Sequence, residues 1–173
     1  MVQRRYKFDP QHVRELLGHT ETDDSTLSLP YARLYLPSLL PPCLKRVLFL
    51  DSDVVVLGAV EKLWAHQLGH QPLATPLFCD SSTKLSTFFT PAFWNQRRLS
   101  GGVWELRDAC SFDAGVMLMD LPKWRQERVT AEVERWLTMQ RDTPGAVLWQ
   151  PGVLPPLLLA LAGRVHAIAP VRV

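Results

Sequence analysis

Residues 46–57, RVLFLDSDVVVL, form an apolar run that is interrupted by two aspartates, Asp51 and Asp53. A near-continuous apolar run is typical of a central strand covered on both faces, so we predict a buried strand that continues through DSD into VVVLG. Two carboxylates are costly to bury in such a strand unless something compensates their charge. The run therefore constrains both the fold and the chemistry of the chain.

The rest of the sequence alternates helix and strand patterns. Pro10 at a helix start and Gly18 at its end predict a short helix, and leucines at helical spacing predict a second over 27–40, which Pro37 breaks. The later patterns predict helices over 60–68, 122–142 and 155–163 and strands over 72–78, 112–121 and 164–170. Residues 80–111 are polar, aromatic and irregular. This alternation indicates an α/β layered sheet.

Composition and charge narrow the classes of function. The chain has 173 residues, of which 47% are hydrophobic, enough for one domain with a real core and too few for two. A net charge of +2 gives no support for binding to nucleic acid. The most apolar late segment, 153–162, is about half the roughly 20 residues that a membrane span needs. We therefore expect no nucleic-acid partner, and no membrane anchor within these residues.

The cysteines leave two interpretations open. Cys43, Cys79 and Cys110 lack the C-x-x-C spacing of a zinc site. Cys79 and Cys110 can form a disulfide in an oxidising compartment. Alternatively, all three are small buried or partly buried residues without a bond.

Asp51 and Asp53 lie two positions apart, so their side chains point the same way on an extended backbone. Two close carboxylates repel each other, and a divalent cation removes that conflict. Hard oxygen ligands suit magnesium or manganese, which commonly bridge one or two carboxylates to substrate phosphates. D-x-D alone is a weak pattern, however, and a solvent-exposed strand end explains it as well.

An apolar strand followed by D-x-D-x-V also resembles the haloacid-dehalogenase phosphatases, in which the first aspartate is a nucleophile and the second an acid/base. That family's motif usually opens the domain, whereas about fifty residues precede it here, and no acidic pair ends a later strand. We keep the phosphatase as the less favoured interpretation.

Longer segments of the sequence favour one of these interpretations of the aspartate pair. Residues 29–64, LPYARLYLPSLLPPCLKRVLFLDSDVVVLGAVEKLW, resemble the stretch around the metal motif of family 8 glycosyltransferases. CSFDAGVMLMDLPKWR resembles that family's second signature, which usually has Asn in place of Asp113. FFTPAFW and LPPLLLALAGRV resemble the plant galacturonosyltransferase-like branch. The resemblance runs from about Tyr6 to about Ile168, with the motifs in the family's order.

This resemblance implies a GT-A fold over residues 1–173, which is a Rossmann-like α/β/α sandwich with a mostly parallel central sheet. It implies a retaining glycosyltransferase that uses Mn2+ and a UDP-sugar donor. For the plant branch it implies UDP-galacturonate as donor, extension of pectin or a related cell-wall polysaccharide in the Golgi, and complexes with other glycosyltransferases.

The family's functional residues carry over by position. Ser52 matches the residue at which the backbone approaches the donor, and Arg33 matches an arginine that contacts the donor sugar or the diphosphate, a task suited to a planar, always-charged fork. Gly115 permits close approach of the backbone to the donor sugar. No residue is implied as a nucleophile. The donor-binding residues implied are Arg33, Asp51, Ser52, Asp53, Asp113, Ala114 and Gly115, with Asp51 and Asp53 as metal ligands.

The sequence departs from the family in three ways. Asp113 places a negative charge where the family has an amide, and weaker donor binding, a changed sugar preference and an added metal ligand are all open. The family's base-binding segment and its C-terminal histidine ligand find no counterpart, so we expect a single GT-A domain truncated at both ends. We expect His66 and His70 at the surface and His166 in a structural role, rather than as replacement ligands. A catalytically inactive binding or scaffold protein is the alternative function.

Aromatic residues have plainer interpretations. Trp124, Trp136, Leu137 and Met139 are expected to form the buried side of the long helix. Phe88, Phe89, Phe93 and Trp94 either line an acceptor cleft or anchor their loop.

Overall fold

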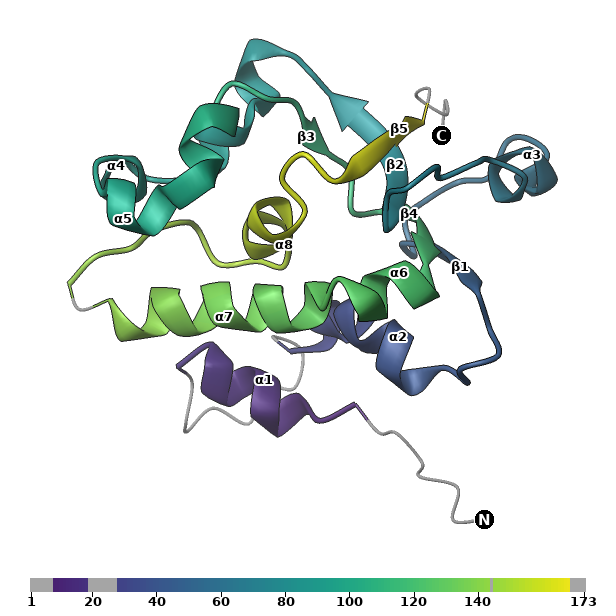
Figure 1. Ribbon diagram of the computed structural model, residues 1–173, viewed down its shortest axis with the longest axis horizontal. Helices are drawn as coiled ribbons and strands as arrows, with labels where there is room; N and C mark the ends of the chain where they lie inside the picture. The colour runs from purple at the N-terminus through teal and green to yellow at the C-terminus, as the bar shows by residue number, and fades with distance from the viewer. Residues whose placement is uncertain (1–7, 19–27, 144, 169–173) are drawn as a thin grey trace.

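The computed structural model describes residues 8–18, 28–143 and 145–168 (Figure 1). Labels with η mark 3₁₀ helices. The elements are, in chain order, α1 (Pro10–Leu16), η2 (Leu29–Tyr35), α2 (Leu36–Leu39), β1 (Arg46–Leu50), α3 (Val60–Trp64), β2 (Leu73–Phe78), η3 (Ser81–Thr83), η4 (Leu85–Phe88), α4 (Pro91–Trp94), α5 (Arg97–Ser100), η5 (Gly101–Leu106), β3 (Ser111–Phe112), β4 (Val116–Asp120), α6 (Leu121–Gln126), α7 (Val129–Asp142), α8 (Leu154–Ala160) and β5 (Val165–Ile168).

The strands form one five-stranded sheet in which β4 lies between β1 and β2. β1 pairs antiparallel with β4, with Arg46 opposite Asp120 and Leu50 opposite Val116. β2 pairs antiparallel with β3 and β4 and parallel with β5. The α/β class is confirmed, but the expectation of a mostly parallel sheet is wrong, because three of these four pairings are antiparallel.

The reversed direction of β4 follows from the way the chain returns to the sheet. The excursion of residues 79–110 leaves the end of β2 and comes back beside the same strand, so that β3 runs against it. A disulfide between Cys79 and Cys110 closes the excursion directly beyond the paired residues Phe78 and Ser111. Of the two interpretations of the cysteines, the structure therefore has the bonded pair, while Cys43 is exposed and free.

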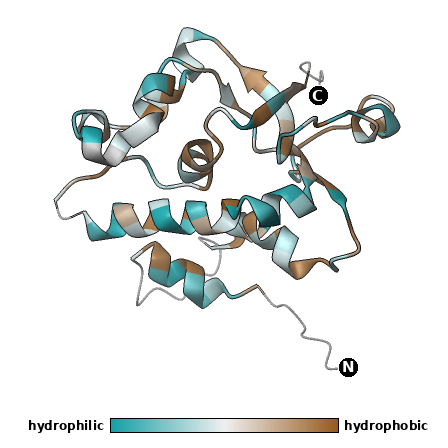
Figure 2. Ribbon diagram, viewed as in Figure 1, coloured by the Kyte–Doolittle hydropathy of each residue, from teal (hydrophilic) through white to brown (hydrophobic). Residues whose placement is uncertain are grey.

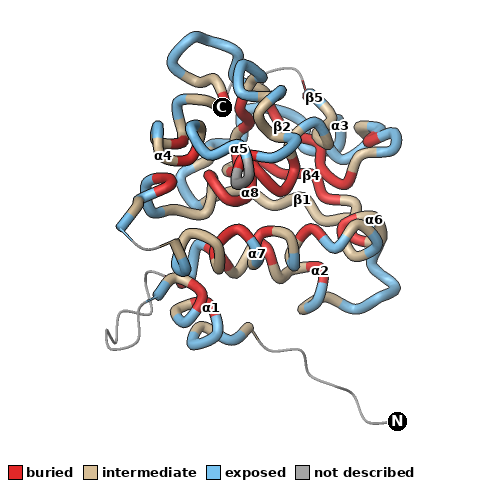
Figure 3. The backbone as a smooth tube through the Cα atoms, turned by 60° about the vertical axis from the view of Figure 1, so that its left-hand side comes forward, coloured by how far each residue is buried: buried red, intermediate tan, exposed pale blue. Residues whose placement is uncertain are grey.

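The core lies mainly on one face of the sheet. Alternate residues of β4, Met117 and Met119, face the large hydrophobic cluster with α6, α7 and α8, whereas Leu118 belongs to a small cluster on the opposite face with Leu68 and Ile168. Buried segments gather on β4, α8 and one side of α7 (Figure 3). α7 lies between α8 and α1 (Figure 1). The two faces of the sheet are thus covered very unequally.

The long predicted helix over 122–142 is two helices. α6 begins where Asp120, the last residue of β4, accepts a hydrogen bond from the backbone N–H of Lys123 at 2.9 Å. Arg128 separates α6 from α7 with a positive φ of 54°. α7 is amphipathic (Figure 2), with its buried residues at helical spacing: Val129, Val133, Trp136 and Leu137.

Two other local predictions are wrong. The strand predicted to continue into VVVLG ends at Leu50, and Val55, Val56 and Leu57 are more than half exposed. Pro37 does not break a helix, since it lies in the first turn of α2 directly after η2. Proline is tolerated in a first turn because the N–H that it lacks has no partner there.

Phe89 and Phe93 are buried in the large cluster, and Phe88 and Trp94 pack against it. Loop anchoring is therefore the interpretation that the structure supports for these four aromatic residues.

Candidate active site

The candidate site begins where β1 ends. The backbone N–H of Asp51 donates to the carbonyl of Gly115 at 2.8 Å, which extends the pairing of β1 with β4 by one residue. The N–H of Val54 donates back to the carbonyl of Asp51 at 3.1 Å and closes a tight turn. Asp51, Ser52 and Asp53 therefore lie on a turn at the carboxyl end of a strand, rather than inside a longer strand as the sequence predicts.

Arg33 holds the side chain of Asp51 in a bidentate ion pair. Its Nη1 donates to Asp51 Oδ2 at 3.0 Å, and its Nη2 donates to Asp51 Oδ1 at 2.8 Å. Nη1 also donates to the carbonyl of Ala114 at 2.8 Å, and Nε donates to the carbonyl of Pro30 at 3.0 Å. The guanidinium lies over the ring of Phe49, 4.5 Å from its centroid. Four hydrogen bonds and an aromatic face fix this planar cation in one orientation.

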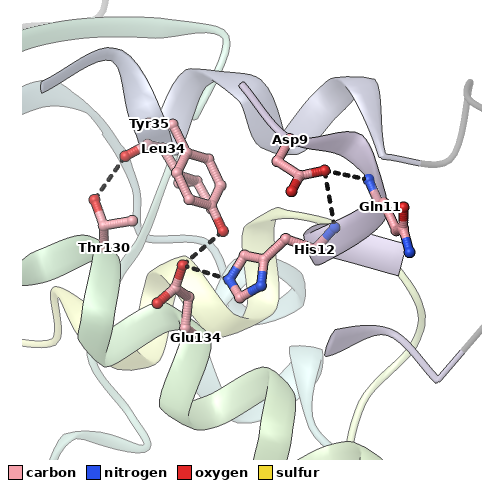
Figure 4. Close-up of polar contacts among 7 residues, drawn as sticks. All are labelled: Asp9, Gln11, His12, Leu34, Tyr35, Thr130 and Glu134. Atoms are coloured by element: carbon pink, nitrogen blue, oxygen red, sulfur yellow. Dashed lines mark hydrogen bonds and ion pairs between the residues drawn. The ribbon is translucent and has the colours of Figure 1, made fainter. Parts of the chain in front are cut away.

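The segment that carries Arg33 is tied to α7. Tyr35 donates to Glu134 Oε1 at 2.8 Å, and the His12 ring contacts the same oxygen at 3.2 Å (Figure 4). The hydroxyl of Thr130 donates to the carbonyl of Leu34 at 2.7 Å (Figure 4). Because Leu34 and Tyr35 directly follow Arg33, their two hydrogen bonds fix the end of η2 against α7.

Asp113, Ala114 and Gly115 form the break between β3 and β4. The N–H of Asp113 donates to the carbonyl of Pro76 at 3.1 Å, and the hydroxyl of Thr75 donates to the carbonyl of Asp113 at 2.5 Å. Asp113 Oδ1 accepts a hydrogen bond from the N–H of Gly115 at 2.7 Å. β2 thus fixes the backbone at Asp113 through two hydrogen bonds, and the Gly115 N–H fixes one carboxylate oxygen of Asp113.

Gly115 is required by the approach of two carboxylates. A Cβ at this position would lie 3.1 Å from Asp113 Oδ1 and 3.4 Å from Asp51 Oδ2. Both oxygens therefore converge on one point of the backbone, and a side chain there would push at least one of them away.

These groups line one hollow of about 360 Å³, whose lining residues are Asp51, Asp53, Val54, Val55, Asp113 and Gly115. Ala114 is buried and contributes its carbonyl to Arg33, and Ser52 is exposed on the turn. The structure thus brings Asp51, Asp53 and Asp113 together from two segments 60 residues apart. Arg33 does not line the hollow but is paired with Asp51, which does. Ser52 lies on the same turn as Asp51 and Asp53 and does not line the hollow either.

The donor atoms fit a divalent metal that is shared with a ligand. Two aspartates bordering an open hollow are the usual protein share of a magnesium or manganese site, in which substrate phosphates supply further oxygens. Among the described residues, no group of three His, Cys, Asp or Glu side chains is placed to hold a metal by itself. Asp51 and Asp53 would therefore share such a metal with further ligands from a bound molecule, from water or from outside the described residues.

Sequence reasoning missed an apolar hollow that adjoins this site. It has a volume of about 410 Å³, and it shares Val54 and Val55 with the acidic hollow. Its other lining residues include Leu50, Leu57, Val116 and Ile168. The sequence signal for this hollow was the VVVL segment, residues 54–57, but its apolar character was interpreted as a buried strand.

The histidine predictions are partly wrong. His66 is partly buried, and its ring lies 5.0 Å from that of His166. His70 is exposed, as expected. None of the three histidines lines the acidic hollow.

The model of glycosyl transferase family 8 matches residues 2–171. The chain belongs to glycosyltransferase family 8. Its curated relatives include "Probable galacturonosyltransferase-like 7" of Arabidopsis thaliana, 40% identical over 163 residues, and "Probable galacturonosyltransferase-like 5" of the same plant, 39% identical over 164. These matches cover 94% and 95% of this chain but 44% of each relative, so the family 8 chain spans about half the length of the curated relatives it matches.

Solved structures show the same fold. The galactosyltransferase LgtC, crystallised with donor and acceptor sugar analogues, aligns with a TM-score of 0.63 and 22% identity, over 92% of this chain and 50% of its own. Mouse xyloside xylosyltransferase 1 aligns with a TM-score of 0.56 and 14% identity, over 91% and 57%. The family 8 chain thus has the GT-A type of fold, which replaces the phosphatase interpretation.

Proposed function

We propose that this family 8 chain forms the metal- and donor-binding part of a retaining glycosyltransferase that uses a UDP-sugar. The observation that carries the proposal is the convergence of Asp51, Asp53 and Asp113 on one hollow, with Arg33 bound to Asp51 at its edge. Residues 1–173 are proposed to belong to one GT-A-type domain. The proposed donor-binding residues are Arg33, Asp51, Ser52, Asp53, Asp113, Ala114 and Gly115, and the proposed metal ligands are Asp51 and Asp53.

The chemistry assigned to the site is stabilisation of a leaving group. Mn2+, when bound, supplies Lewis-acid stabilisation of the diphosphate charge. Asp51 and Asp53 place the cation binding site at the turn after β1. Arg33 holds Asp51 in one orientation, and it still has one N–H, on Nη2, that is used in none of its four hydrogen bonds. That N–H is proposed to reach the donor and stabilise negative charge as the sugar–phosphate bond breaks.

The biological setting rests on the relatives. The names of the curated relatives make UDP-galacturonate the first donor to test and a cell-wall polysaccharide such as pectin the acceptor class. A Golgi location and complexes with other glycosyltransferases are proposed on the same resemblance. The Cys79–Cys110 disulfide supports an oxidising compartment. None of the helices in the described part of the chain has the length and apolar character to cross a bilayer.

The test is titration calorimetry with UDP, in the presence and absence of Mn2+, on this chain and on an Asp51→Ala/Asp53→Ala double variant. We expect UDP to bind with Mn2+, to bind much more weakly without it, and not to bind measurably to the double variant. Asp120→Ala is the matched control, since Asp120 ends β4 and caps α6 away from the hollow. Failure of the parent chain to bind UDP would favour the alternative of an inactive scaffold.

A further inference from the structure

Among the described residues, the carboxylate of Asp113 is hydrogen-bonded through Oδ1 alone, and its Oδ2 is left to face the hollow. Its Oδ1 is held by the N–H of Gly115 at 2.7 Å, and its side chain lines the same hollow as Asp51 and Asp53. The side chain is partly exposed. An amide at this position would keep the bond to Gly115 through its own oxygen and would present an N–H donor with the other atom. A carboxylate presents an acceptor and a negative charge instead.

The charge of the hollow is not balanced by its lining. Three of the six lining residues are aspartates, and the other three are Val54, Val55 and Gly115. Arg33, at the edge, gives two of its hydrogen bonds to Asp51 and two to backbone carbonyls. With Asp51 and Asp53 assigned to the metal and the free N–H of Arg33 to the diphosphate, Asp113 is the charged lining residue left to face a further group of the donor.

A ligand in this hollow therefore faces the hydrogen-bond-accepting, negatively charged carboxylate of Asp113. Sugar hydroxyls donate hydrogen bonds to a carboxylate, whereas a sugar carboxylate is repelled by it. Two unit charges about 6 Å apart, at an effective dielectric constant between those of a protein surface and water, repel by an amount equal to roughly a 3- to 100-fold change in affinity.

We infer that Asp113 makes the sugar subsite selective for neutral, hydroxyl-bearing donor sugars and against uronates. The inference rests on the proposed function, because it requires the donor sugar to occupy this hollow. UDP-galactose and UDP-galacturonate form a matched pair for the test, since they differ only in carrying a hydroxymethyl group or a carboxylate on the same ring. In a subsite of this kind the hydroxymethyl sugar is preferred, so UDP-galacturonate, the donor that the names of the relatives suggest, is expected to bind more weakly than UDP-galactose.

The experiment is titration calorimetry of the chain with UDP, UDP-galactose and UDP-galacturonate, each in the presence of Mn2+. We expect UDP-galactose to bind about tenfold more tightly than UDP-galacturonate, within the range given by the repulsion of two like charges. In Asp113→Asn the ratio of the two affinities is expected to fall to about one. Thermal unfolding of the variant shows whether its fold is intact, and the affinity of the variant for UDP is the reference against which its two UDP-sugar affinities are compared.

Asp142→Asn is the matched control, because it removes one negative charge at the end of α7, outside the hollow, and it is expected to leave the ratio unchanged. Equal or tighter binding of UDP-galacturonate by the parent chain overturns the inference while leaving the proposed function in place. A ratio that Asp113→Asn does not alter overturns the role of Asp113. Absence of UDP binding by the parent chain overturns both proposals.

Discussion

At the scale of single residues, Gly115 is a position where an added side chain would crowd the carboxylates of the site. Its φ lies outside the left-handed region, so alanine is compatible with the backbone, and the effect of a substitution comes from the two carboxylates beside it. We predict that Gly115→Ala weakens binding of UDP with Mn2+ by about tenfold or more, while the melting temperature changes by only a few degrees.

Gly102→Ala is the control for this substitution, since a Cβ at residue 102 would meet nothing within 4 Å and its φ is also ordinary. Calorimetry and thermal unfolding of both variants give the comparison. Unchanged UDP binding in Gly115→Ala would show that the two carboxylates do not take part in it.

At the scale of elements, η2 is held against α7 by Tyr35. We predict that Tyr35→Phe lowers the free energy of unfolding by about 1–2 kcal/mol, because it removes a hydrogen bond to the carboxylate of Glu134. His12→Ala removes the other partner of that carboxylate, but His12 is 46% exposed, so a loss below about 1 kcal/mol is expected. Urea denaturation measures both. A larger loss for His12→Ala would contradict the assignment of Tyr35 as the main tie (Figure 4).

The disulfide acts at the same scale, because it joins the end of β2 to the start of β3. Cys79 and Cys110 are separated by 31 residues, and a closed loop of that length is expected to contribute about 3–4 kcal/mol by restricting the unfolded chain. We predict that Cys79→Ser/Cys110→Ser lowers the free energy of unfolding by this amount.

Cys43→Ser is the control for the disulfide variant, since Cys43 is free and exposed, and it should leave stability within about 0.5 kcal/mol of the parent. Urea denaturation under non-reducing conditions measures all three proteins. Equal stability of the double variant and the parent would mean that the pair does not bond in solution.

At the scale of the whole molecule, buried tyrosines make stability depend on alkaline pH. Burial raises the pKa of Tyr31 to about 12, against about 10 in an unfolded chain. The unfolded state therefore loses its proton first. The contribution of Tyr31 is complete below pH 10 and is lost as the pH rises through 12.

We predict that the free energy of unfolding falls by roughly 2–3 kcal/mol more in the parent than in Tyr31→Phe between pH 10 and pH 12. Urea denaturation at several pH values over this interval measures the difference. Burial and the hydrogen bond to Glu134 also raise the pKa of Tyr35, so part of the decline should remain in Tyr31→Phe. Parallel curves for the two proteins would contradict the assignment to Tyr31.

Much of the fold could be predicted from the sequence because local residue patterns determine its helices and strands. Trp124, Trp136, Leu137 and Met139 were predicted to form the buried side of a helix, and three of them are buried while Met139 packs against the same cluster. The motif D-x-D after an apolar strand located the candidate site, and the family resemblance supplied Arg33 and Gly115 as residues to look for. The α/β class, the family and these site candidates all follow from short stretches of sequence.

The direction of the strands, their pairing and the way in which helices cover the sheet were decided only by the tertiary structure. No local pattern states that β4 runs against β1 and β2, because that depends on where an excursion of about thirty residues returns. The apolar character of Val55, Val56 and Leu57 predicts a strand, yet the turn at Asp51 ends β1 and leaves these three residues more than half exposed. The pairing of Arg33 with Asp51, and the shared hollow with Asp113, join segments that are adjacent only after folding. The sequence by itself determined which residues are candidates for the chemistry, and packing over long distances along the chain determined which of them meet.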